Sequence, residues 1–116
     1  MNVAERGIVM AEKTRAQQLV GDIAPKLADL TDEVLFGDVW RRPELSPRDR
    51  SLVTVASLIS TGSTEQLESH LRLARQNGLT VAELGEAIVH LAFYAGWPRA
   101  MSAVHVAKRV FAEPAD

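Results

Sequence analysis

The chain has no cysteine among its 116 residues. A protein without cysteine cannot form disulfide bonds, thiolate metal sites or thiol nucleophiles. Its three histidines are therefore the main side chains that titrate near neutral pH. We expect proton transfer at that pH to depend on a histidine.

An excess of charge of one sign is also missing. The chain carries 13 Lys and Arg against 15 Asp and Glu, a formal net charge of -2, with no long basic run. We expect no nucleic-acid partner, because such partners are held by clustered cations. No apolar run approaches the roughly 20 residues of a membrane span, and the first residues lack the apolar core of a signal peptide. We therefore expect a soluble, cytoplasmic protein with no membrane partner.

Aromatic residues are scarce, at 5%, although hydrophobic residues make up 47% of the chain. The apolar content is thus mostly Ala, Val, Leu and Ile, which suits close packing of helices. This apolar fraction lies at the high end for the length of the chain. We expect part of it to cover an interface between subunits, since a small monomer hides only a limited share of its surface.

Helix starts and ends recur along the chain, and no segment alternates apolar and polar residues as a strand would. Pro47 follows a capping serine, and Gly62 ends that run. Residues 63–66 and 80–83 both have the spacing of a capping box. The sequence predicts an all-α, single-domain bundle of about six helices, four of them at residues 47–61, 64–77, 81–95 and 98–112.

The N-terminal part is less regular. Residues 13–30 predict one helix interrupted near Pro25, and residues 32–40 a shorter one. We expect residues 1–12 to be a flexible extension and residues 13–113 to form one helical domain.

The helix at 64–77 separates a core face from a polar stripe. Its buried face is marked by Leu67, Leu71 and Ala74. On the solvated face Glu68 and Arg72 have the i, i+4 spacing of an ion pair. Four polar residues share one stripe beside the core face and are expected to point inward: Ser63, Gln66, His70 and Asn77.

The helix at 47–61 is apolar almost all round, so Arg50 begins a narrow polar seam along it. Arg48 and Arg50 lie in its first turn, where the helix dipole disfavours cations, and we expect an anionic group to compensate them. In the helix at 81–95, Glu86, His90 and Tyr94 form one polar line. We interpret that line as a seam between helices or subunits in preference to a site.

Several segments together carry a family resemblance. They are Phe36-Gly-Asp-Val-Trp40-Arg-Arg42-Pro43, Leu45-Ser-Pro-Arg-Asp-Arg50-Ser-Leu52, Leu67-x-x-His70-Leu71, Asn77-Gly-Leu-Thr80 and Tyr94-Ala-Gly-Trp-Pro98. In this order, from about Val34 to Phe111, the chain resembles the carboxymuconolactone decarboxylase family. The resemblance implies the alkylhydroperoxidase D-like all-α fold and assembly as a trimer or a hexamer.

The wider superfamily that this chain resembles has a redox branch. In that branch the corresponding helix carries a Cys-x-x-Cys-x-x-x-His pattern. Aligned on His70, the pattern places its cysteines at Ser63 and Gln66. Disulfide exchange needs one thiolate to attack and another to leave, so thiol peroxidase chemistry is excluded. In the decarboxylase branch the position of Gln66 is often Glu, so here the inward stripe has lost a carboxylate.

The resemblance implies loss of carbon dioxide from gamma-carboxymuconolactone, giving the enol-lactone of 3-oxoadipate, with no metal and no organic cofactor. Such a substrate is a small anionic acid or lactone, and cations must hold it. The candidate residues are His70 as general acid, Arg50 and Arg42 as carboxylate clamps, Gln66 or Tyr94 as donors to the enolate oxygen, and Trp40 and Trp97 as pocket walls.

Each assignment has a structural alternative. His70 could be a hydrogen-bonded core residue, and Arg50 could bridge to Glu83 or Glu86 in an oligomer. Both tryptophans could be packing anchors. For the whole protein, the alternatives are another cofactor-free lyase or isomerase on the same fold, or a non-catalytic oligomeric ligand-binding protein.

Overall fold

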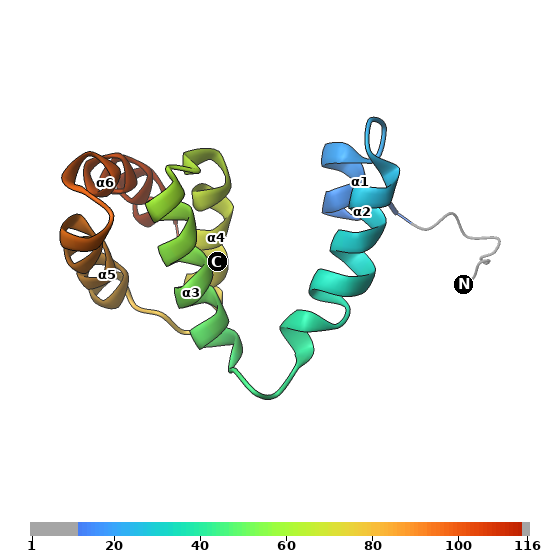
Figure 1. Ribbon diagram of the computed structural model, residues 1–116, viewed down its shortest axis with the longest axis horizontal. Coiled ribbons are helices and arrows are strands. Elements are labelled where there is room, and N and C mark those ends of the chain that lie inside the picture. The colour runs from blue at the N-terminus through green and yellow to red at the C-terminus, as the bar shows by residue number, and fades with distance from the viewer. Residues whose placement is uncertain (1–11, 115–116) are drawn as a thin grey trace. The chain divides into compact units, whose positions relative to one another are not determined.

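A computed structural model describes residues 12–114, and the predicted all-α class is confirmed within them: the described chain has six α-helices and no strand (Figure 1). The predicted flexible extension lies, except for Glu12, outside these residues. No helix within residues 12–114 is both long and apolar enough to cross a membrane. The helices are α1 (Arg15–Val20), α2 (Pro25–Leu30), α3 (Pro47–Thr61), α4 (Thr64–Gln76), α5 (Val81–Tyr94) and α6 (Trp97–Phe111).

The chain divides into two compact units, Met1–Pro43 and Glu44–Asp116, which are described separately. In the first unit the predicted helix at 13–30 is interrupted, as expected, before Pro25, which opens α2. The expected helix at 32–40 takes a different form. It consists of a π-helix, η1 (Thr31–Phe36), and a short 3-10 helix, η2 (Val39–Arg41).

A capping box that the sequence analysis did not identify opens the first unit. The Thr14 side chain accepts a hydrogen bond from the backbone N–H of Gln17, and the Gln17 side chain accepts one from Thr14 N–H. The Thr14 hydroxyl also donates to Asp32 Oδ2 at 2.7 Å. Thr14 therefore both starts α1 and ties it to η1.

The second unit is a bundle of α3 to α6, whose limits agree with the predicted helices to within one residue. Helix α4 packs on α3 and α6, and α5 packs on α6 and α3. The core of the unit is built by thirteen buried residues: Val55, Ile59, Leu67, Leu71, Ala74, Leu79, Leu84, Ile88, Ala100, Ala103, Val106, Ala107 and Val110. Small and branched residues predominate, as the low aromatic content predicts.

Two glycines end α3 and α4. Gly62 has φ 70° and Gly78 has φ 101°, the left-handed region that L-residues avoid. Beyond each glycine the next N–H reaches back to a carbonyl five residues earlier, from Ser63 to Leu58 at 2.9 Å and from Leu79 to Ala74 at 3.0 Å. These tight ends let α4 reverse against α3 after one short turn.

The predicted helix caps are only partly confirmed. The Thr80 and Glu83 capping box is present at the start of α5, and Ser46 caps α3 by accepting from Asp49 N–H. The predicted box at Ser63 is wrong, because the Ser63 side chain makes no cap hydrogen bond. Its hydroxyl instead lies 2.8 Å from the Thr61 hydroxyl, within hydrogen-bond distance.

Candidate functional site

His70 lies in the middle of α4 and is half-buried. Its Nδ1 atom is shielded from solvent. Burial lowers the pKa of the imidazole below its ordinary value, because desolvation disfavours the charged ring. The neutral ring is therefore favoured at neutral pH.

Asn77, seven residues after His70, shows which way this side of α4 faces. Its side-chain amide donates to Ser51 Oγ at 3.0 Å and to the Pro47 carbonyl at 3.4 Å. Residues seven apart in a helix differ by only about 20° in direction. His70 is therefore on the side of α4 that meets α3.

Arg50 lies in the first turn of α3, next to Ser51. It is half-buried, and its Nε atom is shielded from solvent. Thr54, one turn later, is half-buried too, and its hydroxyl donates to the Arg50 carbonyl at 2.8 Å. The polar seam predicted to begin at Arg50 thus continues along α3 in a partly dry environment.

The expected anionic compensation is present for Arg48. This arginine forms ion pairs with Asp49 and with Glu83 of α5. Glu83 also receives the backbone hydrogen bond of its capping box, and that bond is the largest cause of its lowered pKa. One carboxylate therefore caps α5 and offsets a cation at the start of α3.

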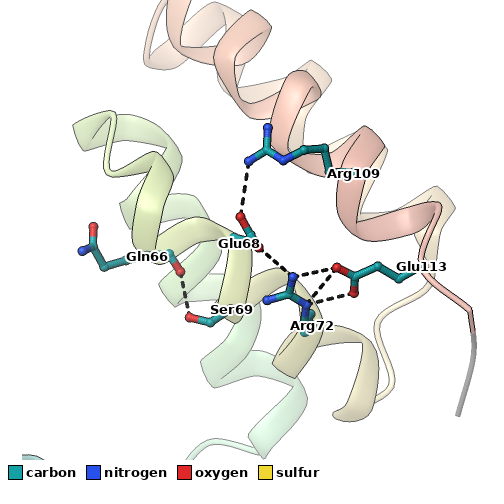
Figure 2. Close-up of polar contacts among 6 residues, drawn as sticks. All are labelled: Gln66, Glu68, Ser69, Arg72, Arg109 and Glu113. Carbon is teal, nitrogen blue, oxygen red and sulfur yellow. Dashed lines mark hydrogen bonds and ion pairs between the residues drawn. The ribbon is translucent and has the colours of Figure 1, made fainter. Parts of the chain in front are cut away.

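Gln66 departs from the predicted stripe, because its side chain is exposed. The expectation that all four stripe residues point inward is wrong at this position. On α4, Gln66 lies about 40° further from the core face than His70 does. Its backbone carbonyl accepts a hydrogen bond from the Ser69 hydroxyl (Figure 2).

Tyr94 and Trp97 lie at the junction of α5 and α6 and are 79% and 60% exposed. Tyr94 stacks on His90 with ring centres 4.8 Å apart, and Trp97 meets Phe93 edge to face at 5.9 Å. These aromatic pairs present a broad apolar surface on the second unit.

The remaining candidates, Trp40 and Arg42, belong to the first unit. Trp40 is half-buried and stacks on Phe36, with ring centres 5.8 Å apart. Arg42 follows η2 directly and is exposed.

An ion-pair network on the other side of α4 was only partly predicted. Arg72 pairs with Glu68, as its spacing indicated, and also with Glu113 beyond the end of α6 (Figure 2). Arg109 adds a contact to Glu68 at 3.3 Å. Hydrogen bonds from Arg72 lower the pKa of both carboxyls. The network joins α4 to α6, whereas Asn77 joins α4 to α3.

Within residues 12–114, no group of three or more His, Asp or Glu side chains is arranged to hold a metal ion. A half-buried imidazole beside a helix that carries a half-buried guanidinium can bind an organic anion and move one proton.

Comparison with known proteins identifies the family of the chain. Residues 25–109 match the carboxymuconolactone decarboxylase family. A 4-carboxymuconolactone decarboxylase of Acinetobacter baylyi is 38% identical over 105 residues, covering 89% of this chain and 78% of that protein. The nitrosuccinic acid decarboxylase npaB of Metarhizium robertsii is 35% identical over 88 residues, covering 76% of this chain and 62% of that protein.

Proposed function

The chain belongs to the carboxymuconolactone decarboxylase family, and we propose that it is a cofactor-free decarboxylase acting on a small carboxylated lactone of the gamma-carboxymuconolactone type. The observation that carries the proposal is the half-buried His70 on the side of α4 that meets α3, the helix bearing Arg50. The absence of cysteine excludes the thiol chemistry of the wider superfamily.

The reaction breaks the bond between a lactone carbon and its carboxylate. Carbon dioxide leaves, and the electron pair passes into the conjugated lactone carbonyl as a dienolate. A proton then adds to carbon and gives the enol-lactone. The protein must hold the carboxylate that remains, stabilise the dienolate and supply the proton.

Arg50 is assigned to the carboxylate that the product retains. A guanidinium on the departing carboxylate would stabilise the ground state and oppose the loss of carbon dioxide. A fork of N–H donors on the retained carboxylate instead orients the substrate without that cost.

His70 is assigned to protonation of the dienolate. Burial lowers the pKa of its ring in the free protein, but a bound dianion favours the imidazolium and raises the pKa again. Binding of the substrate thus favours protonation of the His70 ring, and the ring donates this proton to the dienolate in the last step. Solvent returns the proton to the ring after product release.

Gln66, Tyr94 and Trp97 are exposed on the single chain. A neighbouring subunit that covered these positions would enclose a substrate bound there. We therefore include self-association as a trimer or a hexamer in the proposal. It is supported by the α5–α6 apolar patch, which comprises Val89, Phe93, Tyr94, Trp97 and Met101, each more than half exposed.

The direct test incubates purified protein with gamma-carboxymuconolactone in the presence of a chelator and follows the ultraviolet loss of substrate. We expect turnover well above the spontaneous rate. A rate equal to that of buffer alone would contradict the proposed substrate. A cytoplasmic location is part of the same proposal, and cell fractionation tests it.

A second substrate class comes from one relative. The nitrosuccinic acid decarboxylase matches most of this chain, although the chain covers only 62% of that protein. Nitrosuccinic acid is also a small dicarboxylic acid, which the same clamp and acid could handle. If the protein turned over nitrosuccinic acid but not the lactone, the proposed substrate class would change from lactones to acyclic acids.

A further inference from the structure

We propose that Ser51 and Asn77 are positioning residues, whose hydrogen bond sets the register between the helix that carries Arg50 and the helix that carries His70. The inference rests on the proposed function, since it explains how the two assigned side chains are held. Neither residue is assigned contact with substrate.

The first observation is the environment of the bond. Ser51 is fully buried, at 0% exposed, although its side chain is polar. A buried hydroxyl is costly unless it is hydrogen-bonded. Its partner is the Asn77 amide at 3.0 Å, which also reaches the Pro47 carbonyl at 3.4 Å. The bond is therefore shielded from water at one end and specific in its geometry.

The second observation is where the bond lies along the chain. Ser51 is the residue after Arg50, in the first turns of α3, and Asn77 directly follows α4. The bond thus fixes the end of α4 against the Arg50 end of α3. A slip of one helix along the other would break it.

The third observation is the spacing to His70. Asn77 and His70 point in nearly the same direction, two turns apart, about 10 Å along α4. Because α3 and α4 run antiparallel through the short turn at Gly62, His70 lies about 10 Å further along α3 than Ser51. The hydrogen bond therefore fixes the axial offset between Arg50 and His70, and this offset has to match a substrate held at both.

The Arg72 network does not supply this restraint. It joins the other side of α4 to α6 through exposed or half-buried side chains, which solvent screens. The ion pairs of this network connect α4 to α6 and to Glu113, and none of them reaches α3. Asn77 and Ser51 provide a polar, directional contact on the side of α4 that carries His70.

The test compares Ser51→Ala and Asn77→Ala with Thr80→Ala. The control loses a hydrogen bond of the α5 capping box three residues from Asn77, but it leaves the contact between α3 and α4 intact. Thermal unfolding of all three variants shows whether their losses of stability are comparable. Two variants are used because either alone could fold poorly.

The decisive readout is the NMR signals of the His70 ring, assigned by their loss in His70→Ala among the three histidines. We expect the chemical shifts of the His70 ring to change in Ser51→Ala and Asn77→Ala and to remain unchanged in Thr80→Ala. Unmoved ring signals in both test variants, or an equal shift in the control, would overturn the inference. This readout is independent of turnover.

Kinetics give the second readout. With a substrate that the wild type turns over, we expect kcat to fall about 10- to 100-fold in both test variants, and the double variant to be little worse than either. An unchanged kcat in the folded fraction would overturn the inference while leaving the proposed function intact. A wild type inactive on both acids would contradict the proposed function, and the NMR comparison would still decide the role of Ser51 and Asn77.

Discussion

His70 owes its chemical character to its place on α4. A surface histidine would titrate near its ordinary pKa of about 6.5, but desolvation lowers the pKa of this ring. His70 is half-buried on the side of α4 that meets α3, the helix that carries Arg50. Its position on α4 therefore both lowers the pKa of the ring and turns it toward the side that meets α3.

The pH dependence of turnover tests the role of the ring. An acid must carry its proton, so we expect kcat/KM to fall as pH rises through the pKa of His70 in the free protein, below about 6.5. Since bound substrate raises this pKa, kcat should persist to higher pH. Rate profiles from about pH 5 to pH 8 measure both. A kcat/KM that rises with pH over this range would assign the ring as a base.

Arg50→Lys tests the carboxylate clamp. Lysine keeps the charge but cannot offer two parallel donors, so we expect KM to rise about tenfold or more while the oligomeric state is unchanged. Initial rates and light scattering measure the two effects. Arg48→Lys is the matched control, because Arg48 pairs with Asp49 and Glu83. Loss of assembly at unchanged KM would favour the alternative role of Arg50 as a subunit bridge.

At the scale of helices, sequence patterns predicted the second unit well. Local signals such as Pro47 and Gly62 are properties of a few neighbouring residues, and the helices they delimit agree with the structure. The cap at Ser63 failed because the Thr61 hydroxyl competes for the same side chain. The contact between Arg72 and Glu113 could not be predicted, since 41 residues separate them and no local pattern links them.

Two glycine substitutions test the helix geometry with opposite expected signs. Gly85 is inside α5, and a Cβ there would meet nothing within 4 Å, so Gly85→Ala should raise stability by about 0.5–1 kcal/mol. Gly62 has φ 70°, and a Cβ would also displace the Arg99 side chain, so Gly62→Ala should lower stability by about 1 kcal/mol or more. Chemical denaturation measures both. Two changes of the same sign would contradict this assignment of helix interior and helix end.

At the scale of the whole molecule, the composition predicted that some apolar surface remains exposed on a single chain. Among the described residues, part of that exposed apolar surface lies on α5 and α6. The α5–α6 apolar patch is built around the edge-to-face contact of Phe93 with Trp97. The candidate residues Tyr94 and Trp97 belong to the same patch. Assembly and the completeness of the site are therefore expected to depend on one surface.

Phe93→Glu tests this link. A carboxylate in the centre of a buried interface is strongly unfavourable, so we expect the proposed oligomer to dissociate and turnover to fall with it. Gln76→Glu adds the same charge at an exposed position on α4 and is the control. Light scattering and initial rates follow both variants. An intact oligomer with Phe93→Glu would place the interface elsewhere.

The chain belongs to the carboxymuconolactone decarboxylase family, and the central proposal is that His70 is its proton donor. The most direct measurement compares the kcat of wild type and His70→Ala on gamma-carboxymuconolactone, with thermal unfolding of both. We predict that the wild type turns over and that His70→Ala loses its activity with a melting temperature within a few degrees of the wild type. Activity retained by His70→Ala, with a large fall in its melting temperature, would contradict the account and make His70 a core residue.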